Sequence, residues 1–128
     1  MKTSFGPKRI SINTKGNSRD CFNFLANHLL NGRQILTEPG LQVSRLEDGS
    51  IIELYGTGSF YPDYLFKKNN IVLSFKVDNV ELAVKQLSVT GAKQLGNIEN
   101  LSAEYAFCHL QLSDGTVIGI FQENSINS

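Results

Sequence analysis

The clearest alternation of apolar and polar positions lies between residues 71 and 92, in the run IVLSFKVDNVELAVKQLSVTGA. Its first part repeats with a period of two, which predicts a strand with one face suited to packing under a helix and another free to face a cavity. The apolar positions of the first face are Ile71, Leu73, Phe75 and Val77. Asp78 and Glu81 then fit a capping box, and apolar residues follow at helical spacing. Gly91 supplies a left-handed stop, so the run predicts a strand, a capped helix and a turn.

A fainter copy of this pattern opens the chain. In residues 9–14, RISINT, two isoleucines alternate with polar residues and predict a half-buried strand. A turn rich in Gly and Asn follows, and helical spacing predicts a helix over residues 19–30, capped by Asn17 or Ser18. The two strand-helix units start about 60 residues apart and indicate an internal duplication.

Only strands are expected after each helix. In the first half they are residues 33–37, 41–46 and 51–55, and in the second half 92–95, 105–112 and 116–122, with a polar loop over 97–103. The sequence thus predicts one α+β domain over residues 1–128, built from two βαβββ modules at about 8–56 and 71–123. A ferredoxin-like α+β dimer is the alternative, and three strands after each helix favour the first arrangement.

The connecting segment, residues 57–70, is unusually aromatic for a linker. Its rings are Phe60, Tyr61, Tyr64 and Phe66. Two interpretations stay open: the rings fill a seam between the modules or a dimer contact, or they form a lid or wall over a ligand pocket.

Charge and composition exclude several classes of function. The 12 Lys and Arg residues balance 12 Asp and Glu residues without a basic run, so we expect no nucleic-acid partner. No stretch approaches the roughly 20 apolar residues of a membrane span, and residues 1–17 are too polar for a signal-peptide core, so we expect no membrane partner and a cytoplasmic location. Cys21 and Cys108 have no metal-type spacing and are expected to be buried free thiols.

Together these motifs resemble the vicinal oxygen chelate superfamily, which includes glyoxalase I, bleomycin-resistance proteins and extradiol dioxygenases. The resemblance is best in the second half, where VDNVELAVKQLSVTGA looks like the family's strand-to-helix crossing and SDGTVIGIF like its closing hairpin and last strand. It implies that both modules form a curved mixed sheet around a cavity, with the helices on the convex side, usually completed in a homodimer.

The family's enzymes hold a divalent metal on the concave surface, through side chains from the first strand and a late strand of each module. In this sequence the matching positions are Arg9, Glu53, Val72 and Gly119. Only Glu53 can ligate a metal, whereas a catalytic zinc site takes about three protein ligands. We therefore expect no metal and no other cofactor, and metal-dependent glyoxalase or dioxygenase chemistry is disfavoured.

The two histidines offer little further chemistry. His28 lies near the end of the first predicted helix, where a solvent-facing or helix-end role is expected. His109 lies on the strand YAFCHLQL, where it is either a pocket residue or a satisfied strand histidine.

The leading interpretation is a metal-free protein that binds a small organic molecule in the concave cavity, as the bleomycin-resistance branch does, in a resistance or sequestration role. Polar side chains would orient the ligand, and apolar and aromatic ones would form the wall. The expected ligand-binding residues are Arg9, Ser11, Asn13, Glu53, Tyr55, Phe60, Tyr61, Tyr64, Val72, Ser74, Lys76, His109 and Phe121. Arg9 and Glu53 have a second interpretation, an internal ion pair.

The alternative is an enzyme of the same superfamily, such as a lyase or isomerase, with Glu53 or His109 as general base. Neither is a firm catalytic assignment. The neutral net charge argues against a binder of cationic drugs, so the class of ligand stays open.

Overall fold

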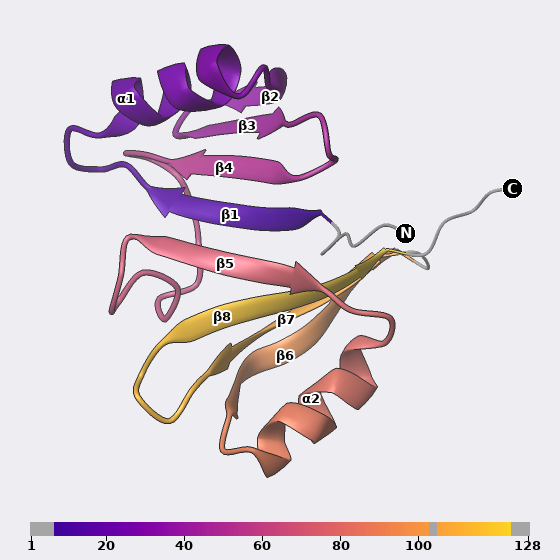
Figure 1. Ribbon diagram of the computed structural model, residues 1–128. Coiled ribbons are helices and arrows are strands. Elements are labelled where there is room, and N and C mark those ends of the chain that lie inside the picture. Colours follow the sequence, from indigo (N-terminus) through magenta and orange to yellow (C-terminus); the bar gives the residue numbers. More distant parts are fainter. Residues whose placement is uncertain (1–6, 103–104, 124–128) are drawn as a thin grey trace, which may run out of the picture. The chain divides into compact units, whose positions relative to one another are not determined.

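The βαβββ order occurs twice in the computed structural model, which describes residues 7–102 and 105–123 (Figure 1). The α+β class and the repeated module are thereby confirmed. The chain divides into two compact units, a first unit that reaches Val72 and a second unit that begins at Leu73. The elements of the first module are β1 (Lys8–Asn13), α1 (Arg19–Phe24), the π-helix η1 (Leu25–Leu29), β2 (Arg33–Glu38), β3 (Leu41–Arg45) and β4 (Ile51–Tyr55). Those of the second are β5 (Ile71–Lys76), α2 (Val80–Val89), β6 (Lys93–Ser102), β7 (Tyr105–Gln111) and β8 (Val117–Glu123).

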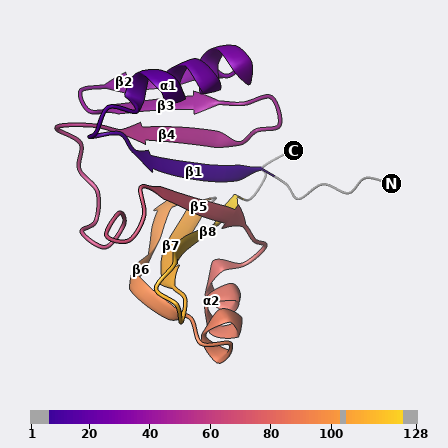
Figure 2. The same ribbon diagram turned by 60° about the vertical axis from the view of Figure 1, so that its left-hand side comes forward.

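In the first unit the strands run in the order β2-β3-β4-β1, and only β1 and β4 are parallel. One face of this sheet packs under the helical segment, and Figure 2 shows α1 lying along it. Its core side chains are Ile12, Ala26, Ile52 and Leu54, with Phe22 packed against them. Because strand side chains alternate between faces, Ser11 and Glu53 lie on the opposite face, which the helix does not cover.

The first helical segment begins at Arg19 as predicted but changes its winding after Phe24, where η1 begins. Leu30 N donates to Leu25 O at 2.9 Å, five residues back, as in a π-helix. Ser18 occupies the N-cap position, but its side chain makes no capping bond, because its backbone is already helical rather than extended.

In the second unit the order is β5-β8-β7-β6, and β5 and β8 are parallel. Helix α2 covers one face, where its buried Val80 and Val84 pack against side chains of the sheet. Those side chains are Ala106, Cys108, Leu110 and Ile120. The predicted stop is confirmed, because Gly91 has a φ of 107°, a conformation that favours glycine.

The cap of α2 was predicted one residue too early. Asn79, and not Asp78, is the N-cap, and its side chain accepts a hydrogen bond from Leu82 N at 2.9 Å. Val77 N still donates to Phe121 O at 2.8 Å, which holds the preceding chain to the sheet. The first residue with cap geometry is therefore Asn79, whose backbone is extended.

The prediction that Ile71, Leu73 and Phe75 lie beneath a helix is wrong. These side chains are 46%, 39% and 38% exposed, whereas Val72 and Ser74 are buried. Alternation separates the two faces of a strand but does not say which one is buried, and here the buried face is the one that carries Ser74, which α2 does not cover.

The prediction of a polar loop over residues 97–103 is also wrong for the residues of this range that the structure describes. Strand β6 continues to Ser102 and pairs with β7, with register shifts between Leu95 and Glu99 and again before Ser102. Such irregularities let a polar, weakly alternating sequence stay in a sheet. Residue 103 lies outside the described residues.

The cysteines differ from each other. Both are free, but Cys21 is exposed, so its predicted burial is wrong, because it lies on a face of α1 that has no buried residue. Cys108 is buried as expected, and burial raises the pKa of its thiol. The thiolate is therefore disfavoured at Cys108.

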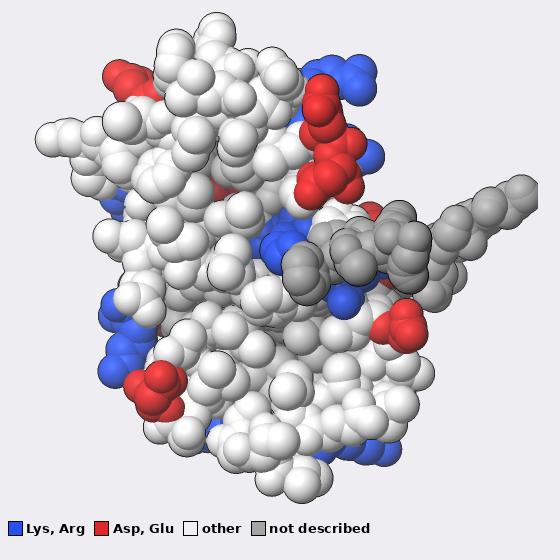
Figure 3. Space-filling model, in the orientation of Figure 1, with Lys and Arg blue, Asp and Glu red and all other residues white. Residues whose placement is uncertain are grey.

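Charged side chains of both signs are interspersed on the face that Figure 3 shows, without a broad patch of one sign. This fits the balanced composition of the sequence. None of the described helices has the length and apolar character that crossing a membrane requires.

Candidate functional site

The parallel pairing of β1 and β4 gathers the most polar cluster of the first unit. Ser11 lies opposite Glu53 in the register, and Arg9 and Tyr55 lie on the same face. The Glu53 carboxylate forms an ion pair with Arg9 and accepts hydrogen bonds from Ser11 Oγ at 2.8 Å and from the Tyr55 hydroxyl at 3.1 Å. We call Arg9, Ser11, Glu53 and Tyr55 the Glu53 cluster. The ion pair predicted as one of two alternatives is thus present.

Burial makes these contacts stronger than surface contacts of the same kind. The Glu53 side chain is 12% exposed and the Arg9 side chain 29% exposed. A carboxylate has about four lone-pair positions, and here three donors, one of them charged, occupy three of them. The carboxylate is therefore fixed in orientation, with about one position left for a further partner.

An aromatic triad lies beside the cluster and consists of Tyr55, Tyr61 and Phe66. The ring centroids are 5.7 Å apart for Tyr55 with either neighbour and 4.9 Å apart for Tyr61 with Phe66, all in edge-on geometry. Lys15 Nζ lies 4.9 Å from the Tyr61 ring centroid. Tyr61 and Phe66 of the connecting segment thus pack on Tyr55 of β4 in the same unit, as expected of the wall of a pocket. Phe60, from the same segment, is 95% exposed.

In the second unit, three predicted site residues lie on the sheet face that α2 does not cover. Ser74 and His109 both pair with Gly119 in the register, and Phe121 follows on the same face. Ser74 and Phe121 are buried and His109 is half-buried, with the Phe107 ring 5.8 Å from the His109 ring. Gly119 is required here, because a Cβ atom at this position would lie 2.1 Å from Ser74 Oγ and 3.2 Å from His109 Cδ2.

Gly119→Ala is therefore expected to lower the free energy of unfolding by about 1–2 kcal/mol, as overpacking does in a well-filled interior. Urea denaturation followed by circular dichroism measures the change. In the Ser74→Ala background the nearest clashing atom is gone, so the same substitution should cost clearly less. An equal cost in both backgrounds would contradict the proposed clash.

Comparisons with known proteins bear on the fold. No protein-family model matches the sequence, and no curated protein matches it either. Among solved structures, a glyoxalase/bleomycin resistance protein/dioxygenase superfamily member from Vibrio splendidus 12B01 has a TM-score of 0.59 at 12% identity, over 91% of this chain and 97% of that chain. The methylmalonyl-CoA epimerase of Streptomyces coelicolor gives 0.56 at 15% identity, over 95% and 100%.

These matches agree with the order of elements in the two modules of this chain. The chain has the vicinal oxygen chelate fold. A structure described as an NAD-dependent benzaldehyde dehydrogenase from Legionella pneumophila is equally similar, with a TM-score of 0.58 at 16% identity, over 92% and 100% of the two chains. Proteins with different names thus match this chain with similar TM-scores. The structural similarity therefore shows the fold but does not identify an activity.

Enzymes with the vicinal oxygen chelate fold hold a divalent metal, and the residues of this chain do not fit one. Arg9 brings a positive charge to the one carboxylate that could serve, and Glu53 already accepts three hydrogen bonds from neighbouring side chains. Val72 and Gly119 carry no ligating atom. Within residues 7–102 and 105–123, no three His, Cys, Asp or Glu side chains gather in a way that could hold a metal ion.

The structure gathers some of the predicted ligand-binding residues but not others. Arg9, Ser11, Glu53, Tyr55 and Tyr61 form one connected group. Asn13 lies at the end of β1, where its Nδ2 donates to Asn70 Oδ1 at 3.5 Å. Of the other predicted residues, Phe60 and Lys76 are exposed, Tyr64 is half-buried, and Val72 is buried on β5. Ser74, His109 and Phe121 belong to the second unit.

Sequence reasoning missed two contributors. Lys15 and Phe66 both contact the Tyr61 ring, although Lys15 lies far from it in the chain. There was a reason in the sequence to include Phe66 in the site, because it lies in the aromatic connecting segment. There was no such reason for Lys15, which lies in a turn. His28 is exposed near the helix end as expected and stacks on Phe24, with centroids 4.8 Å apart.

Proposed function

We propose that this protein binds a small organic molecule at the Glu53 cluster, on the sheet face of the first unit that its helix leaves uncovered, without a metal or cofactor. One observation carries the proposal: a carboxylate held by three donors lies directly beside three aromatic rings. Sites for small ligands typically combine such an oriented polar group with an apolar wall.

The contacts also indicate the kind of ligand. A planar ring can pack against Tyr61 and Phe66, which already form edge-on pairs. A hydrogen-bond donor on the same molecule can reach the remaining lone pair of Glu53. We therefore propose an aromatic or other planar molecule that carries a hydrogen-bond donor, and a sequestration role within a cytoplasmic protein.

Catalysis at Glu53 is less well supported than binding. A general base needs a lone pair directed at the proton that it removes. Here three of the roughly four lone-pair positions of Glu53 already accept from Arg9, Ser11 and Tyr55, so only one position is left to be directed at such a proton.

A homodimer is part of the proposal. Ile71, Leu73 and Phe75 form an exposed apolar row on β5, and a second copy of the chain would bury such a row. Light scattering on the purified protein should give twice the monomer mass, and Leu73→Lys should restore the monomer. A monomer in the unsubstituted protein would contradict this part of the proposal.

A thermal-shift screen of planar aromatic compounds tests the binding site. A ligand present at 100 times its Kd should add about 2.7 kcal/mol of stability. Glu53→Gln and Tyr61→Ala should each abolish or strongly reduce the shift. Phe60→Ala is the matched control, because the neighbouring ring is almost fully exposed and should leave the shift unchanged.

Two results would overturn the proposed site. One is the absence of any stabilising compound in a panel that spans neutral, anionic and cationic aromatic molecules. The other is a shift that survives both Glu53→Gln and Tyr61→Ala, since the ligand would then bind elsewhere.

A further inference from the structure

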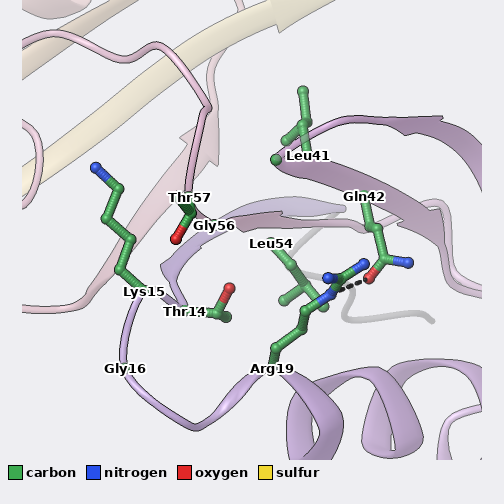
Figure 4. A pocket seen from close by; sticks show the side chains of 10 residues that line it. Thr14, Lys15, Gly16, Arg19, Leu41, Gln42, Leu54, Gly56 and Thr57 are labelled. Carbon is green, nitrogen blue, oxygen red and sulfur yellow. Dashed lines mark hydrogen bonds between the residues drawn. The ribbon is translucent and has the colours of Figure 1, made fainter.

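A pocket of about 210 Å³ lies at one end of the first unit's sheet (Figure 4). Its walls come from the turn after β1, the start of α1, the start of β3 and the turn after β4. The residues that matter here are Thr14, Lys15, Arg19, Gln42, Leu54 and Thr57. Thr14 and Leu54 are buried at its base, and Leu54 belongs to the core beneath α1.

The charged side chains that line this pocket are all positive. Its lining includes Lys15 and Arg19 but no Asp or Glu. Figure 4 shows Lys15 and Arg19 on either side of Thr14, with Thr57 nearby. Two cations without a lining carboxylate create a positive potential inside a concave space, which attracts an anion.

Arg19 is oriented for this task. Its Nε donates to Gln42 Oε1 at 3.2 Å, which restrains one side of the guanidinium group. In the part of the chain that the structure describes, its two terminal nitrogens make no further hydrogen bond. A guanidinium group held in this way offers its remaining donors in a fork that matches two oxygens of one oxyanion.

Glycine packing preorganises the opposite wall. Gly40 has a φ of 82°, and a Cβ atom there would lie 2.7 Å from Thr57 O and 2.6 Å from Ser59 N. Gly56 N donates to Gly40 O at 2.7 Å. These close backbone contacts hold the turn after β4 against the turn before β3, which places Thr57 at the pocket without help from a ligand.

We propose that this pocket binds a phosphate-class anion, either free inorganic phosphate or the phosphoryl group of a small metabolite. Two cations and the hydroxyl group of Thr57 supply donors for a dianion of tetrahedral shape. The pocket volume of about 210 Å³ exceeds that of a phosphate group and leaves space for part of an attached metabolite. None of the residues of the Glu53 cluster lines this pocket, but Lys15 both lines it and contacts the Tyr61 ring of the proposed aromatic site.

Lys15 connects the anion pocket with the aromatic triad. Its ammonium group lies 4.9 Å from the centroid of the Tyr61 ring. An anion in the pocket competes with the ring for this charge, because a cation-π contact at an exposed site is worth only about 0.5–1 kcal/mol. Anion binding should therefore change the environment of Tyr61 as well as that of the pocket.

Titration of the ¹⁵N-labelled protein with inorganic phosphate and with glycerol 3-phosphate, followed by NMR, tests the proposal. Saturable shifts are expected at the amides of Gly16 and Thr57, with a Kd of about 1 mM or tighter for at least one of the two probes. The probe that binds more tightly identifies the source of the anion. The Lys15→Gln/Arg19→Gln double variant should weaken binding by about tenfold or more, because it removes both charged donors.

The control is the double variant Arg33→Gln/Lys68→Gln, which removes two exposed positive charges of the same unit that do not line the pocket. It should bind as the unsubstituted protein does. Shifts that do not saturate with either probe, or equal weakening in the two double variants, would overturn the proposal, since both results describe diffuse attraction to surface charge.

Discussion

Leu110→Ala is expected to lower the free energy of unfolding by about 2–5 kcal/mol. Leu110 on β7 has an exposed fraction of 0% and packs in the core between the sheet of the second unit and α2. The substitution removes buried methyl groups and leaves a cavity that close-packed neighbours cannot fill by relaxing. Urea denaturation monitored by circular dichroism measures the difference.

Leu101→Ala is the matched control for this prediction. Leu101 lies on β6 of the same unit and is 68% exposed, so its truncation should change the free energy of unfolding by no more than about 0.5 kcal/mol. Similar losses for the two variants would contradict the assignment of the core to the face between α2 and the sheet.

Arg9→Met is the second substitution with a large expected effect. It keeps most of the apolar stem but leaves the Glu53 carboxylate, which is 12% exposed, without its cation. Breaking one side of a buried ion pair costs about 3–5 kcal/mol, and partial exposure of Arg9 reduces the expected loss to about 1–3 kcal/mol.

A double-mutant cycle separates this loss from other effects of the substitution. In the Glu53→Gln background the carboxylate charge is absent, so Arg9→Met should then cost markedly less. Arg45→Met, at an exposed position on β3, is the control for loss of a positive charge alone. Equal costs for Arg9→Met with and without Glu53 would show that the ion pair does not stabilise the fold.

The sequence predicted the parts of the fold that depend on local signals. The period-two runs, the stop at Gly91 and the hairpin at Asp114 and Gly115 each need only neighbouring residues to be recognised. The pairing of Arg9 with Glu53 was also accessible, because both lie on strands whose places in the module are known once the βαβββ order is recognised.

What the sequence could not predict depends on tertiary structure. Which face of β5 becomes buried is decided by long-range packing in the sheet, because Ser74 is buried on the face that α2 does not cover, and alternation within the strand carries no information about this packing. The cap at Asn79 instead of Asp78 depends on how far the chain stays bonded to β8 after β5 ends. The anion pocket is formed by turns that are distant in the chain, so no single motif marks it.

The central claim is that the Glu53 cluster and the aromatic triad together form the ligand site. The most direct measurement is an NMR map of backbone amide shifts on titration with a stabilising compound from the screen. We predict saturable shifts centred on Ser11, Glu53, Tyr55 and Tyr61, with the same midpoint at each residue. Shifts that leave these four amides unchanged while others move would contradict the claim, because the ligand would then occupy a different part of the protein.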